Sequence, residues 1–297
     1  MNPDIATSDG SSASAAQLEV ELVTSASIPL ALPGLLPDGG TRTWAPTTTT
    51  LISGARDAVL VDPPLTTAQA DAVLARVQAS GRRLTEIVVT HAHGDHWFSA
   101  AKIAAATGAR VVADPAVIEA MHGALRTRPG FWDQILPAQI PPSPVTAVPV
   151  PDNQLDLEGE TIGIVPLGHT DTDPTTVVHL PSLALVVAGD VVYDDTHLFL
   201  VESGGDGRDQ WREALDRLEN LAATHLVAGH ATRRAPGDAH ALIGATRAYL
   251  DDVDALLPRC TAPEEFFRAM TRRHPTRANP STLWGGTLAL YAHHRGS

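Results

Sequence analysis

Cysteine is nearly absent from this sequence, because Cys260 is the only one among 297 residues. A single cysteine cannot form an intramolecular disulfide, so the fold is stabilised without one, and the cysteine usage gives no sign of an oxidising compartment. Cys260 lies in a short segment between Pro258 and Pro263, far in sequence from the motifs described below. We therefore interpret it as an incidental thiol without a catalytic role.

Basic residues are scarce relative to acidic ones, since 21 Lys and Arg against 34 Asp and Glu give a net charge of −13. This excess of negative charge disfavours nucleic acids and anionic membranes as partners, and it argues against a nuclease. No apolar run reaches transmembrane length. Residues 1–16 lack the basic start and apolar core of a signal peptide. The sequence predicts a cytoplasmic protein with a disordered leader over residues 1–16.

The remaining composition is that of a globular enzyme. The chain is 43% hydrophobic and 19% charged, which allows it to bury a large core. Strand-like and helix-like patterns alternate and favour one α/β domain over residues 17–297. Within it, residues 236–297 form a helical C-terminal appendage, with helices predicted at 238–257, 263–273 and 280–291.

Local patterns predict the elements that lead into the first half of the domain. Strands are expected at 17–23, 48–52, 58–61 and 110–113. Helices are expected from Thr66 or Thr67 to Gly81, from His96 to Thr107, and after Asp114-Pro115.

Two further segments are predicted to lack regular structure. Residues 129–151 contain seven prolines and are expected to form an ordered surface loop, either a stiff connection or a binding loop. Residues 28–36 read IPLALPGLL and either pack onto the body of the protein or form an apolar flap over the site.

The densest group of metal-binding side chains is the hexapeptide His91-Ala92-His93-Gly94-Asp95-His96. It directly follows residues 87–90, an apolar run typical of a buried strand. Histidine offers a neutral nitrogen and aspartate a hard oxygen, a mixture that zinc accepts. This density favours a metal site over a polar turn with solvated histidines.

Three later dipeptides repeat one arrangement, in which an apolar run is followed by a glycine and a ligand. They are Gly168-His169, Gly189-Asp190 and Gly229-His230. Glycine lets the backbone turn sharply and keeps Cβ bulk away from an ion, while the strand supplies rigidity. Each dipeptide is weak evidence by itself, but the four segments in this order predict one shared site.

With these four segments, the sequence resembles the metallo-β-lactamase superfamily, whose pattern is HxHxDH followed by a His, an Asp and a final His on successive strand ends. The resemblance covers about residues 17–235. It implies an α/β fold, a four-layered αββα sandwich, with a two-metal site at one edge and, in this chain, C-terminal helices beyond it. It also implies a first metal bound by His91, His93 and His169, a second bound by Asp95, His96 and His230, and a bridge by Asp190.

Physical chemistry supports this division of ligands. Two ions about 3.5 to 4 Å apart need a bridging anion, which Asp190 supplies and a neutral imidazole cannot. A hydroxide held between them would be the nucleophile, because metal-bound water has a pKa of about 7. Asp95 is both a ligand and a candidate to accept or relay a proton. We predict two Zn²⁺ ions, with iron or manganese as alternatives.

Tyr193 lies three residues after Asp190, the offset at which the N-acyl homoserine lactonases of this superfamily carry a tyrosine that contacts the substrate carbonyl. We predict that Tyr193 stabilises a developing oxyanion, with a core tyrosine as the alternative. Asp62 is predicted to orient a ligand histidine. His197 and Trp284 are further candidates for the pocket, although core or surface placement is the more common explanation for such residues.

These observations predict a di-zinc metallohydrolase that uses a metal-bridging hydroxide to hydrolyse an ester, lactone, thioester or amide bond of a small molecule. True β-lactamases replace the bridging aspartate with Cys or Ser, so Asp190 argues against that activity. A glyoxalase II-like thioesterase is an alternative, with Arg247, Arg272 and Arg273 as candidate glutathione contacts. A non-haem iron oxygenase or oxidoreductase of the same fold is another. The expected partner is a small-molecule substrate, and a homodimer is allowed.

Overall fold

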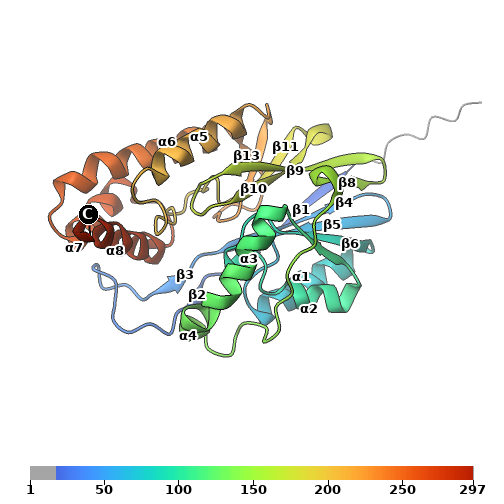
Figure 1. The fold of residues 1–297 in the computed structure, drawn as a ribbon, viewed down its shortest axis with the longest axis horizontal. Helices are drawn as coiled ribbons and strands as arrows, with labels where there is room; N and C mark the ends of the chain where they lie inside the picture. The colour runs from blue at the N-terminus through green and yellow to red at the C-terminus, as the bar shows by residue number, and fades with distance from the viewer. Residues whose placement is uncertain (1–17, 297) are drawn as a thin grey trace, which may run out of the picture.

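Two β-sheets packed face to face form the centre of the protein in this computed structural model, which describes residues 18–296 (Figure 1). The first sheet has the order β1-β4-β5-β6-β7, with β1 (Glu19–Ser25), β4 (Thr47–Ser53), β5 (Asp57–Val61), β6 (Arg83–Val88) and β7 (Arg110–Val112). The second has the order β13-β12-β11-β10-β9-β8, with β8 (Gln154–Leu157), β9 (Glu160–Gly168), β10 (Thr175–Leu180), β11 (Leu185–Gly189), β12 (His225–Ala228) and β13 (Gly237–Asp238). A small third sheet pairs β2 (Ile28–Pro29) with β3 (Thr43–Trp44). The leader predicted over residues 1–16 lies outside the described residues.

Helices cover the outer face of each large sheet (Figure 1). The helices on the first sheet are α1 (Thr67–Ser80), α2 (Ala100–Thr107) and α3 (Pro115–Thr127), and those on the second are α5 (Gly207–Glu219) and α6 (Ala239–Leu256). The chain ends in α7 (Pro263–Arg273) and α8 (Pro280–Gly296), beside one end of the sheets. The short turns are α4 (Trp132–Ile135) and the 3-10 helices η1 (Gly94–His96), η2 (Arg128–Gly130), η3 (Pro151–Asn153), η4 (Pro181–Leu183) and η5 (Leu257–Arg259).

Side chains point alternately to the two faces of each strand, and this alternation explains the layers of the fold. On β5, Ala58 and Leu60 face the core under the first group of helices, whereas Val59 and Val61 face the core between the sheets. On β11, residues 186 and 188 likewise face α5 and α6, while residues 185 and 187 face the other sheet. Side chains two apart lie on the same face of a strand, so apolar residues at every position bury both faces of these strands. The fold is therefore the predicted αββα sandwich.

Several helix ends follow the predicted capping signals. Thr66 caps α1 in a capping box with Gln69, and Gly81 ends that helix with φ 66°. Asp114 caps α3 by accepting a hydrogen bond from Ala116 N at 2.8 Å. The prediction for residues 96–107 was wrong at its start, because α2 begins at Ala100 and the metal motif instead occupies η1.

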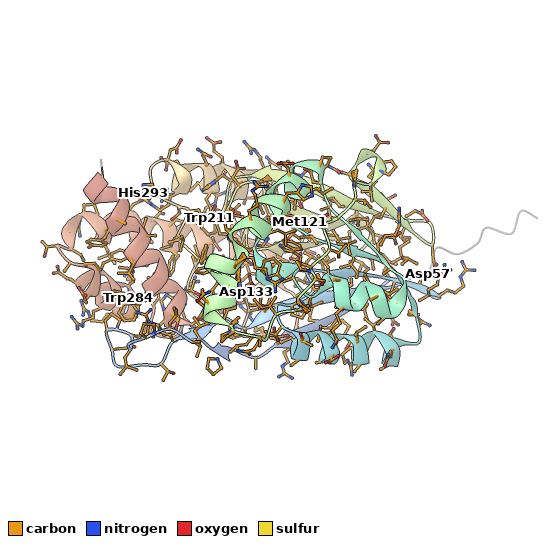
Figure 2. The ribbon with its side chains drawn as sticks, turned by 60° about the horizontal axis from the view of Figure 1, so that its bottom comes forward. Asp57, Met121, Asp133, Trp211, Trp284 and His293 are labelled. Atoms are coloured by element: carbon orange, nitrogen blue, oxygen red, sulfur yellow. The ribbon has the colours of Figure 1, made fainter. Side chains whose placement is uncertain are left out.

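The C-terminal helices form as predicted, with α6 on the second sheet and α7 and α8 packed beyond it. Trp284, labelled among them in Figure 2, is 8% exposed. It meets the Phe267 ring edge-on, with the two ring centroids 5.7 Å apart. The core interpretation of Trp284 is therefore the one that the packing supports. None of the helices in residues 18–296 combines the length and hydropathy needed to cross a bilayer.

The two segments predicted to be irregular contain some local order. Leu30 and Leu32 pack against the core of the first sheet, while Leu35 is 60% exposed, so residues 28–36 mainly cover the body. In residues 129–151, Trp132 and Ile135 are buried in the one-turn helix α4. A short helix fits here because residues 130–136 contain no proline.

Candidate metal centre

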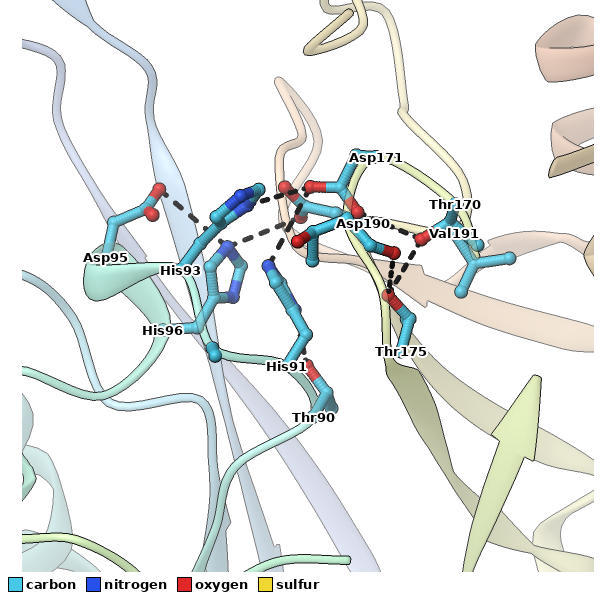
Figure 3. A network of polar contacts seen from close by, with 12 residues as sticks. Thr90, His91, His93, Asp95, His96, Thr170, Asp171, Thr175, Asp190 and Val191 are labelled. Carbon is cyan, nitrogen blue, oxygen red and sulfur yellow. Dashed lines mark hydrogen bonds and ion pairs between the residues drawn. The ribbon is translucent and has the colours of Figure 1, made fainter. Parts of the chain in front are cut away.

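Strand ends from both sheets meet at one edge and carry the predicted ligands (Figure 3). The hexapeptide follows β6, Asp190 follows β11 and His230 follows β12. Backbone hydrogen bonds tie these ends together, since Gly229 N–H donates to Gly189 O and Thr48 N–H donates to Gly229 O, both at 2.7 Å. A Cβ on Gly229 would overlap Asp190 Oδ1. Glycine is therefore needed here for the close approach, as the sequence suggested.

Six of the seven predicted ligands come together in two adjoining groups. The first group is His91, His93, Asp171 and Asp190, and the second is Asp95, His96 and His230, with the ligand atoms of each group within 4.8 Å of one another. Asp190 belongs to the first group and also contacts the second, because its Oδ1 is 3.4 Å from His96 Nε2 and its Oδ2 is 3.1 Å from His230 Nε2. This placement suits the predicted bridging role. His169 belongs to neither group, and Asp171 stands in the first group in its stead.

Buried ligand atoms at the centre of these groups fit the binding of a cation. Four buried ligand atoms, His91 Nε2, His96 Nε2, Asp171 Oδ2 and Asp190 Oδ1, make no hydrogen bond of good geometry. Polar atoms near them belong to other candidate ligands, such as His93 Nδ1 at 2.9 Å from Asp171 Oδ2. Buried polar atoms without partners cost about 1–3 kcal/mol each, and more when charged. Nitrogen and carboxylate donors in this arrangement match the preferences of divalent zinc, iron or manganese. The residues therefore fit the binding of divalent metal ions.

Outer contacts fix the ligand histidines so that their other nitrogen faces the centre. Asp62 Oδ2 lies 3.1 Å from His96 Nδ1, so Asp62 contacts one of the candidate ligand histidines, as the predicted orienting role requires. His230 Nδ1 lies 2.7 Å from the carbonyl oxygen of Pro46. A proton donated from Nδ1 in each contact leaves Nε2 as the ligand atom. Thr90 Oγ1 also donates to Asp62 Oδ2 at 2.7 Å, which holds that carboxylate in place.

Burial and neighbouring carboxylates act in opposite directions on the histidines of the centre. Burial disfavours the imidazolium form, but Asp171 and Glu202 overcome this and raise the pKa of His93 to about 10. Burial also acts to lower the pKa of His230, but Asp190 outweighs this effect and helps to raise the pKa to about 10. The carboxylates thus create a negative potential at the centre. Divalent cations would neutralise it when they replace the protons on the ligands.

Tyr193 contacts the centre through Asp190. Its hydroxyl donates a hydrogen bond to Asp190 Oδ2 at 2.8 Å, and the residue is 1% exposed. Burial, with the charge of Asp190, raises the pKa of Tyr193 well above its usual value, so the phenol stays a neutral donor. Its predicted contact with a substrate oxyanion stays a prediction. His197 Nδ1 lies 2.8 Å from Tyr249 Oη, among the residues that attach its loop to the C-terminal helices.

A pocket of about 580 Å³ lies beside the two groups. Side chains of the metal groups that line it are His93, Asp95, Asp190 and His230, and the aromatic ones are Trp44, Phe131, Trp132 and Phe199. Phe131 and Trp132 come from the proline-rich segment, so part of that segment does form the pocket wall. Tyr193, His197 and Trp284 are not among the lining residues. This volume is within the range of small-molecule sites.

Three residues of the site were not predicted from the sequence. Asp171 stands two positions after His169 in a short Thr-Asp run, which was a signal that could have been used. Trp44 Nε1 donates to Asp95 Oδ2 at 2.8 Å, and Glu202 Oε1 lies 3.2 Å from His93 Nε2. These two contacts span 51 and 109 positions, and no local pattern announces them.

Comparisons with known proteins agree with this architecture. The family model described as "Metallo-beta-lactamase superfamily" matches residues 42–230, and no curated protein matches the sequence. A metallo-beta-lactamase family protein from Thermus thermophilus is 21% identical, with a TM-score of 0.60 and coverage of 93% of this chain and 94% of that one. A beta-lactamase domain protein from Burkholderia ambifaria is 16% identical, with a TM-score of 0.60 and coverage of 91% and 84%. The enzyme FIM-1 from Pseudomonas aeruginosa, in its mono-zinc form, is 16% identical, with a TM-score of 0.54 and coverage of 78% and 91%.

At these identities, the solved structures demonstrate a shared fold. The family match reaches further, because residues 42–230 make up more than half of the chain and include both groups of candidate ligands. The strand-end motifs, the layered architecture and the family match all lead to the same assignment. This chain belongs to the metallo-beta-lactamase superfamily.

Proposed function

We propose that this protein is a metal-dependent hydrolase that cleaves an ester, lactone, thioester or amide bond in a small molecule. The observation that carries the proposal is the convergence of buried histidines and aspartates on a pocket of about 580 Å³. Unpaired ligand atoms face one another inside these groups. Four side chains of the groups, His93, Asp95, Asp190 and His230, line the pocket. A substrate in the pocket would therefore lie against the metal centre.

Two ions would be held by the two groups, with Asp190 shared between them. When bound, such ions lower the pKa of a water molecule to about 7 and polarise a substrate carbonyl. We propose zinc, because nitrogen and oxygen ligands suit it and because FIM-1, which shares the fold, was solved in a mono-zinc form. Iron and manganese are the alternatives, since they accept the same donors.

Asp95 is the carboxylate that we assign to proton transfer. It lines the pocket, is 1% exposed as a residue, and accepts a hydrogen bond from Trp44 Nε1 at Oδ2. Burial acts to raise the pKa of Asp95, but His96 and His230 outweigh it and keep the carboxyl ionised. An ionised carboxylate held at the pocket wall accepts a proton from an attacking water and returns it to the leaving group.

The pocket wall favours a substrate with an apolar or aromatic part. Trp44 and Trp132 meet edge-on with ring centroids 4.6 Å apart, and Phe131 lies 5.2 Å from Trp132. These rings and the alanines beside them offer an apolar surface next to the polar centre. Such a surface holds the body of a substrate while its scissile bond faces the metal ligands.

The arginines considered for a glutathione thioesterase have other partners. Arg247 Nη2 donates to Asp216 at 2.5 Å, and Arg273 Nε donates to Asp252 at 3.0 Å. Neither of them, nor Arg272, is among the residues that line the pocket. We therefore propose a hydrolase of another small-molecule ester or amide in preference to a glyoxalase II-like enzyme.

Metal removal combined with a substrate panel tests this proposal. The full-length protein would be assayed as isolated, after chelation, and after reloading with Zn²⁺, Mn²⁺ or Fe²⁺, against one ester, one lactone, one thioester and one amide. We expect hydrolysis of at least one class, its loss on chelation and its return on reloading. Oxygen consumption by the iron-loaded protein with the same compounds tests the oxygenase alternative. Hydrolysis that persists in demetallated protein, or no hydrolysis by fully loaded protein, would contradict the proposal.

A further inference from the structure

Gly123 lies inside the helix α3, although neither the backbone nor the packing of the protein requires a glycine there. Its φ is not in the positive range that favours glycine. A Cβ built at this position lies 3.6 Å from Arg126 Nη2, which is an ordinary contact. No other heavy atom of the described residues lies within 4 Å, apart from the backbone of the helix and the adjacent residues. Glycine inside a helix is destabilising relative to alanine, so the space beside Gly123 calls for an explanation.

The space beside Gly123 belongs to the pocket of the metal centre. One face of α3 lines this pocket with Ala120 and with the residues three, four and seven positions later, Gly123, Ala124 and Thr127. Residues at this spacing lie on the same side of a helix. All four are small, so the pocket extends toward the axis of α3 along this face.

An aromatic wall leads from the metal ligands to the edge of the same pocket. Trp44 Nε1 donates to Asp95 Oδ2 at 2.8 Å, and the centroid of the Trp44 ring is 4.6 Å from that of Trp132. Phe131 follows, with its centroid 5.2 Å from that of Trp132. Phe131 is 46% exposed, and it is the one aromatic residue among the exposed large hydrophobic residues in the described part of the chain. An apolar group bound in the pocket would remove this ring from water, which is favourable.

We propose that Gly123 determines the substrate specificity of the pocket, because its missing side chain leaves room for an extended apolar group such as an alkyl chain. The chain would lie between the small face of α3 and the aromatic wall, with its far end at Phe131. This inference rests on the proposed function and names the substrate class for that site. The scissile bond lies at the metal ligands, and a substrate with an alkyl part of several carbons is preferred to one with a methyl group in its place.

A binding series measures this space without requiring turnover. The full-length protein, saturated with Zn²⁺, would be titrated by calorimetry with neutral primary alcohols from pentanol to decanol, so that the charge of Arg126 plays no part. In the parent, affinity should rise by about 4-fold for each methylene that enters the pocket, until the space is filled. Gly123→Val should end this rise at a shorter chain. It should weaken binding of the longest alcohols by roughly 10-fold, because its side chain takes the place of about two methylenes.

Gly244→Val is the matched control. Gly244 also lies inside a helix, α6, where it is exposed and a built Cβ has no heavy atom within 4 Å. It does not line the pocket. Valine should therefore destabilise both helices to a similar extent in chemical denaturation, whereas only Gly123→Val should alter the alcohol series.

Two milder variants keep the test decisive if Gly123→Val does not fold. Gly123→Ala should raise the denaturation midpoint and still weaken binding of the longest alcohols, so that stability and binding change in opposite directions. Phe131→Ala should weaken the longest alcohols and leave the shortest unchanged, because it removes apolar surface at the far end only.

An alcohol series in Gly123→Val that matches those of the parent and Gly244→Val would overturn the proposal. Equal weakening of every alcohol would overturn it as well, because a loss independent of chain length is not a loss of space. Without a folded Val variant, an unchanged series in both Gly123→Ala and Phe131→Ala has the same consequence. Hydrolysis that is absent although the alcohol series behaves as expected would remove the proposed function and leave the apolar space established. Hydrolysis with no dependence of affinity on chain length would remove this inference alone.

Discussion

The two candidate metal positions differ in how firmly their ligands are held. In the second position, each ligand has a fixed outer partner: Asp62 for His96, the Pro46 carbonyl for His230, and the Trp44 indole for Asp95. In the first position, Thr90 Oγ1 lies 3.0 Å from His91 Nδ1 and Thr170 donates to Asp171 Oδ1. His93, however, contacts Glu202, whose side chain is 47% exposed, and Asp171 stands on a turn beyond β9. Ligands that follow buried strands directly and have buried partners are positioned by the fold, whereas a ligand on a turn depends on the local path of the chain.

Asp190 connects the two positions, so its removal should have the largest effect. Asp190→Ala takes away the one carboxylate that reaches both groups, and we expect reduced occupancy of at least one metal position and a fall in turnover by orders of magnitude. The sandwich should remain folded, because the strand ends are also held by backbone hydrogen bonds. Elemental analysis, circular dichroism and the substrate panel measure these effects. Asp71→Asn, an exposed carboxylate change on α1, is the control, and two bound ions with near-normal activity would contradict the bridging role.

Asp62 tests the firmness of the second position. Asp62→Ala removes the acceptor for His96 Nδ1, and we expect metal affinity or turnover to fall by about 10- to 100-fold. Asp62 also has φ 53°, a left-handed conformation that asparagine tolerates better than alanine. Asp62→Asn therefore separates the backbone role of Asp62 from its role in orienting His96. The Asn variant should fold more stably than Asp62→Ala, but its metal affinity should be reduced as in Asp62→Ala. Competition with a chromophoric chelator measures the affinity, and parent-like affinity in both variants would refute the orienting role.

Tyr193 sharpens the same comparison, because its hydroxyl acts on the shared ligand Asp190. If it positions Asp190, Tyr193→Phe should weaken metal binding, with a loss within the roughly 10- to 100-fold range of outer contacts. If it stabilises a substrate oxyanion, as the sequence suggested, turnover should fall by about 10² to 10³ while metal affinity stays unchanged. Measuring both quantities distinguishes these roles. A variant with parent-like affinity and parent-like turnover would make Tyr193 a packing residue.

The fold and most of the centre could be predicted because their signals are local. Apolar runs mark the strands, capping residues mark the helix starts, and each of His91, Asp190 and His230 follows an apolar run within a few positions. Such features depend on the hydrophobic pattern and on backbone geometry, which the sequence displays directly.

The remaining contacts depend on how distant segments meet. Trp44 reaches Asp95 and Glu202 reaches His93 only after the sheets have packed, and neither contact has a sequence period. His169 and Asp171 illustrate a different difficulty. His169 fits the strand, glycine and ligand pattern, whereas Asp171, two positions later, has its ligand atom among those of the first group. A pattern of residue types fixes which side chains are near an edge, but not which of two neighbours points inward.

His197 provides a contrast with the histidines of the centre, because it is buried and no carboxylate acts to raise its pKa. Burial first, then Arg277 and His274, lower the pKa of His197 to about 3, against about 6.5 in an unfolded chain. Between about pH 6.5 and about pH 3, His197 therefore binds a proton in the unfolded chain but not in the native state. The free energy of unfolding should fall with decreasing pH in this window, by up to about 1.4 kcal/mol per pH unit for this group.

His197→Gln removes this titrating group and should flatten that dependence. Chemical denaturation of parent and variant, both in excess metal, measures the difference at each pH. Metal release at low pH affects both proteins, so the difference between their slopes is the relevant quantity. Equal slopes would show that His197 does not stay neutral in the folded protein.

The smallest effect is expected at Arg126, on the part of the pocket wall that α3 supplies. It is the one Arg or Lys among the described residues that line the pocket, and it has no ion pair with any of residues 18–296. Its guanidinium extends from α3 across Gly123, where an added Cβ would lie 3.6 Å from Nη2.

An exposed cation such as Arg126 contributes up to about 1 kcal/mol to an ion pair. Arg126→Met should therefore raise KM for substrates that carry a carboxylate by no more than about 5-fold, with kcat unchanged. Added salt should reduce the difference between parent and variant. Neutral analogues should show no change, and Arg259→Met, an exposed arginine outside the pocket, is the control. An equal rise in KM for charged and neutral substrates would mean that Arg126 shapes the wall without recognising an anion.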